Sequence, residues 1–155
     1  SDNYVTINRT LSTPITVTGW AKVTDFTKTG EGFLDPTPHS VLYISLNTNG
    51  IGDIYVYIGN GSIWLSAPTI SSVNMVQSVW HYVTFTSNGS VSKLYLDAVL
   101  VGTSNYAPSG YGPYYQLGSL STGGESYIKG YLDDVRIYNR ALSAAEIYAL
   151  YSATR

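Results

Sequence analysis

The chain has no cysteine, and Lys and Arg together number only eight in 155 residues. Without cysteine, neither a disulfide nor a thiolate metal site can form. The net charge of −2 and the few basic residues argue against a nucleic-acid partner, which would need a basic stripe to neutralise phosphates. The sequence therefore predicts no nucleic-acid binding, and a fold that its own hydrophobic core must stabilise.

Long apolar segments are also missing. No apolar run approaches the roughly 20 residues of a membrane span, and no charged-then-apolar leader opens the chain, so we expect no membrane insertion. Ser, Thr, Asn, Gly and Tyr are abundant, a composition associated with secreted or cell-surface proteins of bacteria and archaea. We expect residues 1–155 to be one domain, excised from a larger protein of this kind and monomeric as a module.

Strand patterns recur at short, regular spacing with turn residues between them, and the only helical pattern lies at the C-terminal end. This arrangement predicts an all-β sandwich with one short helix. The segments 24–40 and 104–113 are expected to be long loops. Strands are expected near residues 4–8, 15–24, 41–47, 53–59, 62–67, 80–87, 90–97, 99–103, 114–118 and 126–138.

The C-terminal helix has a clear predicted start. Ser143 and Glu146 have the spacing of a capping box, and Leu142 and Ile147 match a hydrophobic staple around it. A helix this short is marginal alone, so its apolar stripe is expected to dock on a sheet. In the preceding strand, strict alternation places Asp133 on the side of Val135 and Ile137, and places on the other side Leu132, Asp134, Arg136 and Tyr138.

Three stretches carry a family resemblance: ITVTGWAKV (15–23), VWHYVTFTSNGSVSKLYLDAVLVGT (79–103) and GYLDDVRIYNRALSAAEIYALY (130–151). In this order they resemble the laminin G-like, concanavalin A-like lectin and glucanase domains of bacterial or archaeal surface proteins. The resemblance implies an antiparallel two-sheet jelly roll. Such domains begin with a further strand before the segment SDNYVTI, which again indicates an excised domain. Their middle hairpin turns through Asp-Gly, whereas this chain has Asp97-Ala98, and we expect a less tight or different turn because alanine resists positive φ.

Asp133 is the candidate metal ligand. The resemblance implies a structural Ca²⁺ near the chain ends, held by the first Asp of this strand and by backbone carbonyls. Calcium takes about six to eight oxygen ligands, and adjacent strand residues aim at opposite faces, so at most one of the two carboxylates lies in a given site. Asp134 is expected to pair with Arg136 or a neighbouring strand. The alternative is that both carboxylates only fix the strand against the helix through hydrogen bonds.

Aliphatic and aromatic residues alternate in three consecutive strands. If the aliphatic side chains fill the core, four aromatic side chains lie on the reverse face, together with Asp53: Tyr43, Tyr55, Tyr57 and Trp64. Consecutive strands are usually neighbours, so we expect these four rings to form one exposed aromatic row. Aromatic faces with a hydroxyl rim suit the C–H faces of sugar rings. The alternative is that Tyr decorates a solvated sheet without binding anything.

A Gly- and Tyr-rich segment supplies two further candidate ligand-binding residues, Tyr111 and Tyr114. Its composition is typical of an adaptable binding rim. The alternative is a surface loop whose rings cover a sheet edge.

The segment TDFTKTGEGFLDPTPHS holds three carboxylates and a histidine: Asp25, Glu31, Asp35 and His39. Related glycoside hydrolases carry their carboxylates on one strand in close alternation, and no segment here has that pattern. We expect a solvated loop stiffened by its prolines. His81 is expected to be a strand residue with a hydrogen-bonded ring, and no Gly-x-Ser-x-Gly nucleophile motif occurs.

These observations predict a non-catalytic carbohydrate-binding module of a secreted or cell-surface protein. A polysaccharide or glycan would stack on the Tyr and Trp side chains, and Ca²⁺ would brace the ends of the sandwich. The alternative is a protein–protein adhesion or stalk module, in which the same aromatic residues contact another surface protein.

Overall fold

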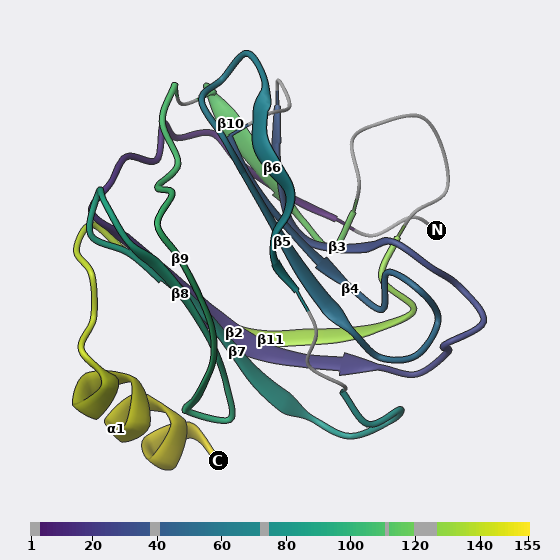
Figure 1. The fold of residues 1–155 in the computed structure, drawn as a ribbon. Helices are drawn as coiled ribbons and strands as arrows, with labels where there is room; N and C mark the ends of the chain where they lie inside the picture. The colour runs from purple at the N-terminus through teal and green to yellow at the C-terminus, as the bar shows by residue number, and fades with distance from the viewer. Residues whose placement is uncertain (1–3, 38–40, 72–74, 111, 120–126) are drawn as a thin grey trace.

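The computed structural model describes residues 4–37, 41–71, 75–110, 112–119 and 127–155. Within these residues a six-stranded and a five-stranded antiparallel sheet pack face to face, and one helix lies on the outer side of the five-stranded sheet (Figure 1). The all-β sandwich with a short C-terminal helix is therefore confirmed. No helix in the described ranges is both long enough and apolar enough to cross a bilayer.

The six-stranded sheet has the order β1 (Val5–Ile7), β10 (Tyr114–Leu117), β3 (Glu31–Thr37), β4 (Leu42–Leu46), β5 (Ile54–Gly59) and β6 (Trp64–Ser71). The five-stranded sheet has the order β11 (Gly130–Tyr138), β2 (Ile15–Val23), β7 (His81–Ser87), β8 (Ser92–Leu96) and β9 (Val99–Ser104). The helix α1 spans Ala144–Thr154.

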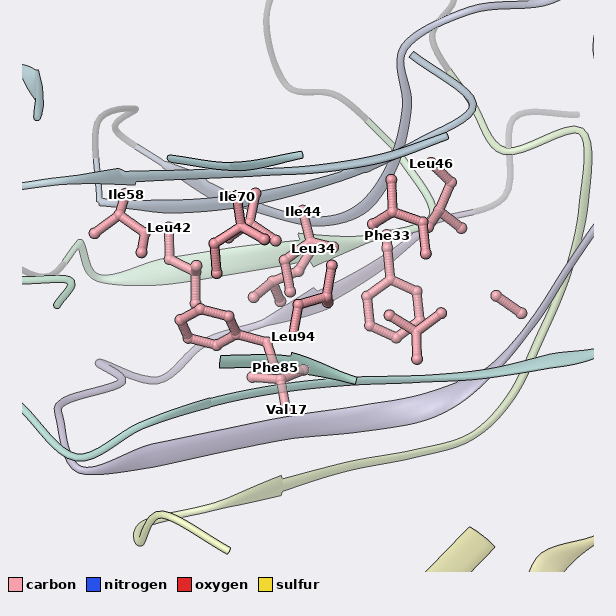
Figure 2. Packing of buried hydrophobic residues seen from close by; sticks show 14 of the residues in the cluster. Val17, Phe33, Leu34, Leu42, Ile44, Leu46, Ile58, Ile70, Phe85 and Leu94 are labelled. Carbon is pink, nitrogen blue, oxygen red and sulfur yellow. The ribbon is translucent and has the colours of Figure 1, made fainter. Parts of the chain in front are cut away.

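The core fills the space between the sheets, as Figure 2 shows. The predicted aliphatic faces of β4 and β5 are buried, with Ile44 and Val56 fully inaccessible. Phe85 and Leu94 meet them from the five-stranded sheet (Figure 2). Alternation therefore assigned the inward faces of these strands correctly, and their other faces point away from the core.

Helix α1 begins as predicted. The backbone N–H of Glu146 donates to Ser143 Oγ at 3.3 Å, and the N–H of Ser143 donates to Glu146 Oε2 at 2.9 Å. The bonds that the Glu146 carboxylate accepts from the N–H of Ser143, from Arg140 and from Ser143 Oγ lower the pKa of Glu146 to about 2. Ile147 is fully buried in a small cluster with Leu142, so the predicted staple also forms. The helix docks on the five-stranded sheet, where Thr154 accepts a hydrogen bond from Trp20 Nε1 at 3.0 Å.

The faces predicted for β11 are wrong beyond Asp133. Asp133 pairs with Trp20 and Arg136 with Thr18, so two residues of β11 lie opposite Gly19 alone. Such a β-bulge inserts one residue and reverses the alternation that follows it. Asp134 sits in the bulge with φ at 48°. Asp133, Arg136 and Tyr138 consequently share the outer side, with their partners Trp20, Thr18 and Thr16, while Leu132 and Ile137 pack against the core.

Segment 24–40 is not the solvated loop that was expected. Residues 31–37 form β3, which pairs with β10 and β4 in the interior of the six-stranded sheet. Glu31 and Asp35 are both fully buried there. The expectation about the middle hairpin is also wrong, because Asp97 and Ala98 both adopt positive φ, at 51° and 63°, as a tight two-residue turn requires.

Candidate functional site

The aromatic row lies on the outer face of the six-stranded sheet. Tyr43 pairs with Tyr57 across β4 and β5, and their stacked ring centroids are 5.5 Å apart. Tyr57 also contacts Tyr55 at 6.2 Å and Trp64 on β6 at 5.8 Å. The structure therefore brings the four predicted rings together into one continuous aromatic surface, at spacings typical of interacting aromatic pairs.

Each of the four rings is partly exposed. Burial is the main cause that raises the pKa of both Tyr43 and Tyr57. Both hydroxyls therefore stay protonated at neutral pH and can donate as well as accept hydrogen bonds. Tyr43 donates to the carbonyl of Gly30 at 3.4 Å.

Polar groups border one end of the aromatic row. Asp53 is 2% exposed and accepts hydrogen bonds from the backbone N–H and the Nδ2 of Asn49, at 3.0 and 2.7 Å. The same Nδ2 lies 2.8 Å from the hydroxyl of Tyr55. Asn49 thus links the predicted Asp53 to the aromatic row, although its place in an Asn-Gly turn gave no sign of this role.

At the other side of the row lies Asp35, which was expected in a solvated loop. Leu34 pairs with Ile44, so the next residue, Asp35, faces outward beside Tyr43. Its charge adds to the causes that raise the pKa of Tyr43. Asp35 is fully buried, and a strand pattern interrupted by Pro36 hid this position from sequence reasoning.

Tyr114 begins β10 and lies on this outer face as well. It pairs with Thr37, and Gln116 pairs with Asp35, whereas the intervening Tyr115 is 1% exposed and packs in the core. Tyr114 is separated from the aromatic row by β3. Tyr111 lies outside the described residues, so the predicted pair is placed only in part.

The charges on this sheet have one sign. Among the strands that the structure describes, none of the six in this sheet contains Lys or Arg. The aromatic row is instead flanked by the carboxylates of Asp35 and Asp53. The face is therefore apolar to acidic, and an anionic ligand would be repelled from it.

The other acidic residues of segment 24–40 do not join Asp35. Glu31 pairs with Leu46 and points toward the core side, where its Oε2 accepts a hydrogen bond from the N–H of Lys129 at 3.0 Å. Asp25 accepts hydrogen bonds from Thr27 that lower its pKa. His39 lies outside the described residues.

His81 has both ring nitrogens bonded, as expected. Nε2 accepts from the N–H of Val76 at 3.0 Å, so Nδ1 carries the proton that is shared with Asp97 Oδ2 at 2.8 Å. This arrangement fixes the hairpin turn against β7, and it leaves no ring nitrogen to act as a base.

The predicted metal ligand Asp133 is exposed, and its Oδ1 accepts a hydrogen bond from the N–H of Asp134 at 2.8 Å. Asp134 pairs with Arg136 Nε at 2.9 Å, as expected, while its Oδ2 is buried and accepts no hydrogen bond from the described residues. Across those residues, no three His, Cys, Asp or Glu side chains cluster closely enough to hold a metal. Calcium binding stays a prediction, and any such site would need backbone carbonyls to complete it.

Several solved structures share this fold at low identity. The native heptameric SAP-like pentraxin from Limulus polyphemus is 15% identical with a TM-score of 0.70, and the match covers 96% of this chain and 75% of that one. Domain 4 of AbnA, a GH43 extracellular arabinanase from Geobacillus stearothermophilus in complex with arabinotriose, is 23% identical with a TM-score of 0.71, covering 91% and 68%. The binding domain of botulinum neurotoxin serotype D is 14% identical with a TM-score of 0.74, covering 99% of this chain but only 41% of that one.

No curated protein matches the sequence with significance. The family described as the concanavalin A-like lectin/glucanases superfamily does match, over residues 1–148. This range includes all the strands and half of α1. The chain therefore belongs to the concanavalin A-like lectin/glucanase superfamily.

Proposed function

We propose that the domain is a non-catalytic carbohydrate-binding module of a secreted or cell-surface protein, and that glycan binds on the aromatic row. The observation that carries this proposal is the continuous surface of four partly exposed rings on neighbouring strands, bordered by polar groups at its ends. Contiguous exposed aromatic surface of this kind marks contact sites on soluble proteins.

The binding mechanism follows from the side chains. The C–H faces of sugar rings stack on the rings of Tyr57 and Trp64, and the hydroxyls of Tyr43 and Tyr55 form hydrogen bonds with sugar hydroxyls. Asn49 orients the Tyr55 hydroxyl and is itself exposed, so its amide can also contact the ligand. An open sheet face buries little of its ligand compared with a cleft, so the expected affinity is modest.

The charges indicate which glycans bind. Because the sheet has no basic side chain in its described strands and carries Asp35 and Asp53 beside the rings, uronic acids and sulfated or sialylated glycans would meet like charge. We infer that the ligand is a neutral polysaccharide.

The separation of the two carboxylates supports a binding role. Asp35 lies opposite Tyr43, which pairs with Tyr57, and Asp53, the residue immediately before β5, is four residues from Tyr57. This offset is about 13 Å along the strand and roughly 10 Å across two strand spacings, or ~16 Å in total between Cα atoms. Glycosidases need carboxyl groups about 5 to 9.5 Å apart around the scissile bond, so this pair is too distant for hydrolysis.

A structural Ca²⁺ at Asp133 belongs to the same proposal. Its support is the buried Oδ2 of the neighbouring Asp134, since a carboxylate oxygen without a hydrogen-bond donor among the described residues is costly and a nearby cation would offset that cost. The ion would brace the ends of the sandwich and would bind, and so stabilise, the folded state only.

A glycan screen tests the proposed function. Wild-type protein, Trp64→Ala and Tyr55→Ala are applied to an array of neutral and anionic glycans, with and without chelator. Tyr148→Ala is the matched control, because Tyr148 is 63% exposed on α1, on the other sheet. We expect binding to neutral glycans that both aromatic-row variants lose and the control retains. Binding that survives both substitutions, or that favours anionic glycans, would reject the proposal.

A further inference from the structure

An open pocket of about 480 Å³ lies on the opposite side of the sandwich from the aromatic row, where the C-terminal end of α1 meets the starts of β7 and β11. Its lining includes Trp20, Trp80, Tyr151, Asp133 and Arg155. The volume is in the range of small-molecule binding sites. None of these side chains takes part in the aromatic row.

The floor of this pocket is held rigidly. Trp20 is 9% exposed, its Nε1 donates to Thr154 Oγ1 at 3.0 Å, and its ring centroid lies 5.6 Å from that of Tyr151. A third ring, Tyr82, lies 5.1 Å from Trp20 on the neighbouring strand. The aromatic floor is therefore fixed before any ligand arrives, which lowers the entropic cost of binding.

One wall of the pocket carries the exposed ring of Trp80, and the exposed ring of Tyr131 lies beside Trp80 outside the pocket lining. Trp80 is 40% exposed and Tyr131 is 61% exposed, and their centroids are 6.3 Å apart with an interplanar angle of 46°. Trp80 immediately precedes β7 and Tyr131 lies at the start of β11, and their rings meet above β2, which separates these strands in the sheet. Adjacent exposed aromatic rings beside a rigid concave surface indicate a ligand that presents an apolar face.

The charges lining the pocket nearly cancel. Both oxygens of Asp97 already accept hydrogen bonds, from His81 Nδ1 and from the N–H of Tyr82. With no Ca²⁺ bound, Asp133 then contributes one negative charge, and Arg155, which lies 5.7 Å over the Tyr151 ring, contributes one positive charge. A phosphate or an organic cation would need an excess of one sign, whereas a neutral polyol uses both as hydrogen-bond partners.

We propose that this pocket is a second saccharide site, which takes one neutral sugar unit stacked on Trp80 and oriented by Arg155 and, in the Ca²⁺-free domain, by Asp133. This inference rests on the proposed function for its ligand class, a neutral glycan, but it uses residues outside the aromatic row. Because the two sites lie on opposite faces of the sandwich, one domain would join two glycan chains rather than follow a single chain. Such bivalence raises the avidity for a dense polysaccharide without any new contact.

The three tryptophans make the test selective. Trp64 reports on the aromatic row, while Trp20 and Trp80 report on the pocket, through their indole N–H signals in a ¹H–¹⁵N spectrum. The probes are the methyl glycosides of glucose, galactose, mannose, xylose and arabinose, each titrated alone to about 100 mM, since single-sugar sites bind in the millimolar range. We expect saturable shifts of the Trp20 and Trp80 signals that persist in Trp64→Ala.

Two variants complete the test. Trp80→Ala should weaken the pocket's binding by about tenfold or more, judged from Trp20, and leave the Trp64 titration unchanged. Tyr131→Ala, at a position that is 61% exposed, should weaken sugar binding in the pocket without disturbing the fold. If the Trp64 signal shifts on addition of sugar while the Trp20 and Trp80 signals do not, the second site alone is overturned. Static signals from all three would overturn both sites, and pocket shifts that vanish in Trp64→Ala would show a single site.

Discussion

Glu31 should make the stability of the domain fall as the pH rises. Its side chain is fully buried, Oε2 accepts one hydrogen bond from the Lys129 N–H, and Oε1 accepts none from the described residues. Burial, and secondarily the charge of Asp25, raises the pKa of Glu31 from 4.5 to about 7 against the opposing hydrogen bond. The folded state thus holds a proton that the unfolded state releases.

The sign and size of the effect follow from this difference. Between pH 4.5 and about 7 the folded protein binds more protons than the unfolded chain, so its free energy of unfolding decreases as the pH rises through this window and is level above it. The two pKa values correspond to roughly 3 kcal/mol at most, because each pKa unit is worth about 1.4 kcal/mol. This is a large part of the stability of a typical domain.

Urea unfolding followed by Trp fluorescence measures the effect, with wild type and Glu31→Gln compared from pH 4 to pH 9. Since other groups titrate in both proteins, the quantity of interest is the difference between the two free energies of unfolding. We expect the free energy of unfolding of the wild type to fall, relative to that of Glu31→Gln, by up to roughly 3 kcal/mol between pH 4.5 and 8. A difference that stays constant over this range would refute the reasoning.

Glu146 is the matched control, because its pKa is lowered to about 2 by Ser143 and Arg140. A lowered pKa gives stability that is present above the unfolded value and lost as the pH falls. The difference between the free energies of unfolding of wild type and Glu146→Gln should therefore change only below about pH 4.5. There the wild type loses stability, relative to the variant, as the pH falls.

Three further predictions concern the backbone and the metal. Gly19→Ala should destabilise the domain by about 1 to 3 kcal/mol in urea unfolding, because its Cβ would lie 2.9 Å from Val135 Cγ2 in the bulge of β11; an unchanged midpoint would contradict the bulge. Ala98→Gly should stabilise it by about 1 kcal/mol by relieving a φ of 63°, and a loss of stability would exclude that turn. Calcium should raise the melting temperature of the wild type, with the increase lost on chelation and in Asp133→Asn; an equal increase in Asp133→Asn but none in Asp134→Asn would move the site to Asp134.

The sequence predicted the strands that carry the aromatic row because their pattern has one simple cause. In β4 and β5 every second residue is aliphatic and fills the core, so Tyr43, Tyr55 and Tyr57 had to point outward. Turn residues on either side fixed the ends of these strands. Asp53 could be placed by continuing the same alternation.

The remaining parts of the site depend on contacts that alternation does not encode. The strand β3 has the composition of a loop, because it contains Glu31, Asp35 and Pro36. It is nevertheless buried, since it pairs with β10 on one edge and with β4 on the other. The bulge at Asp134 adds one residue to β11 without any change in its composition. The one residue that reflects it is Gly19 on the neighbouring strand, where a side chain would collide with Val135. Asn49 joins the site through the geometry of a turn. In each case a tertiary partner overrides the local pattern.

The central claim is that neutral glycan binds on the aromatic row, and gel retardation tests it most directly. Wild type, Trp64→Ala and Tyr148→Ala are run through native gels that contain paired polysaccharides of the same backbone, one neutral and one carboxylated. We predict retardation of wild type and Tyr148→Ala by a neutral polysaccharide, weaker retardation by its carboxylated partner, and free migration of Trp64→Ala. Equal retardation of Trp64→Ala and wild type, or stronger retardation by the carboxylated polysaccharide, would contradict the account.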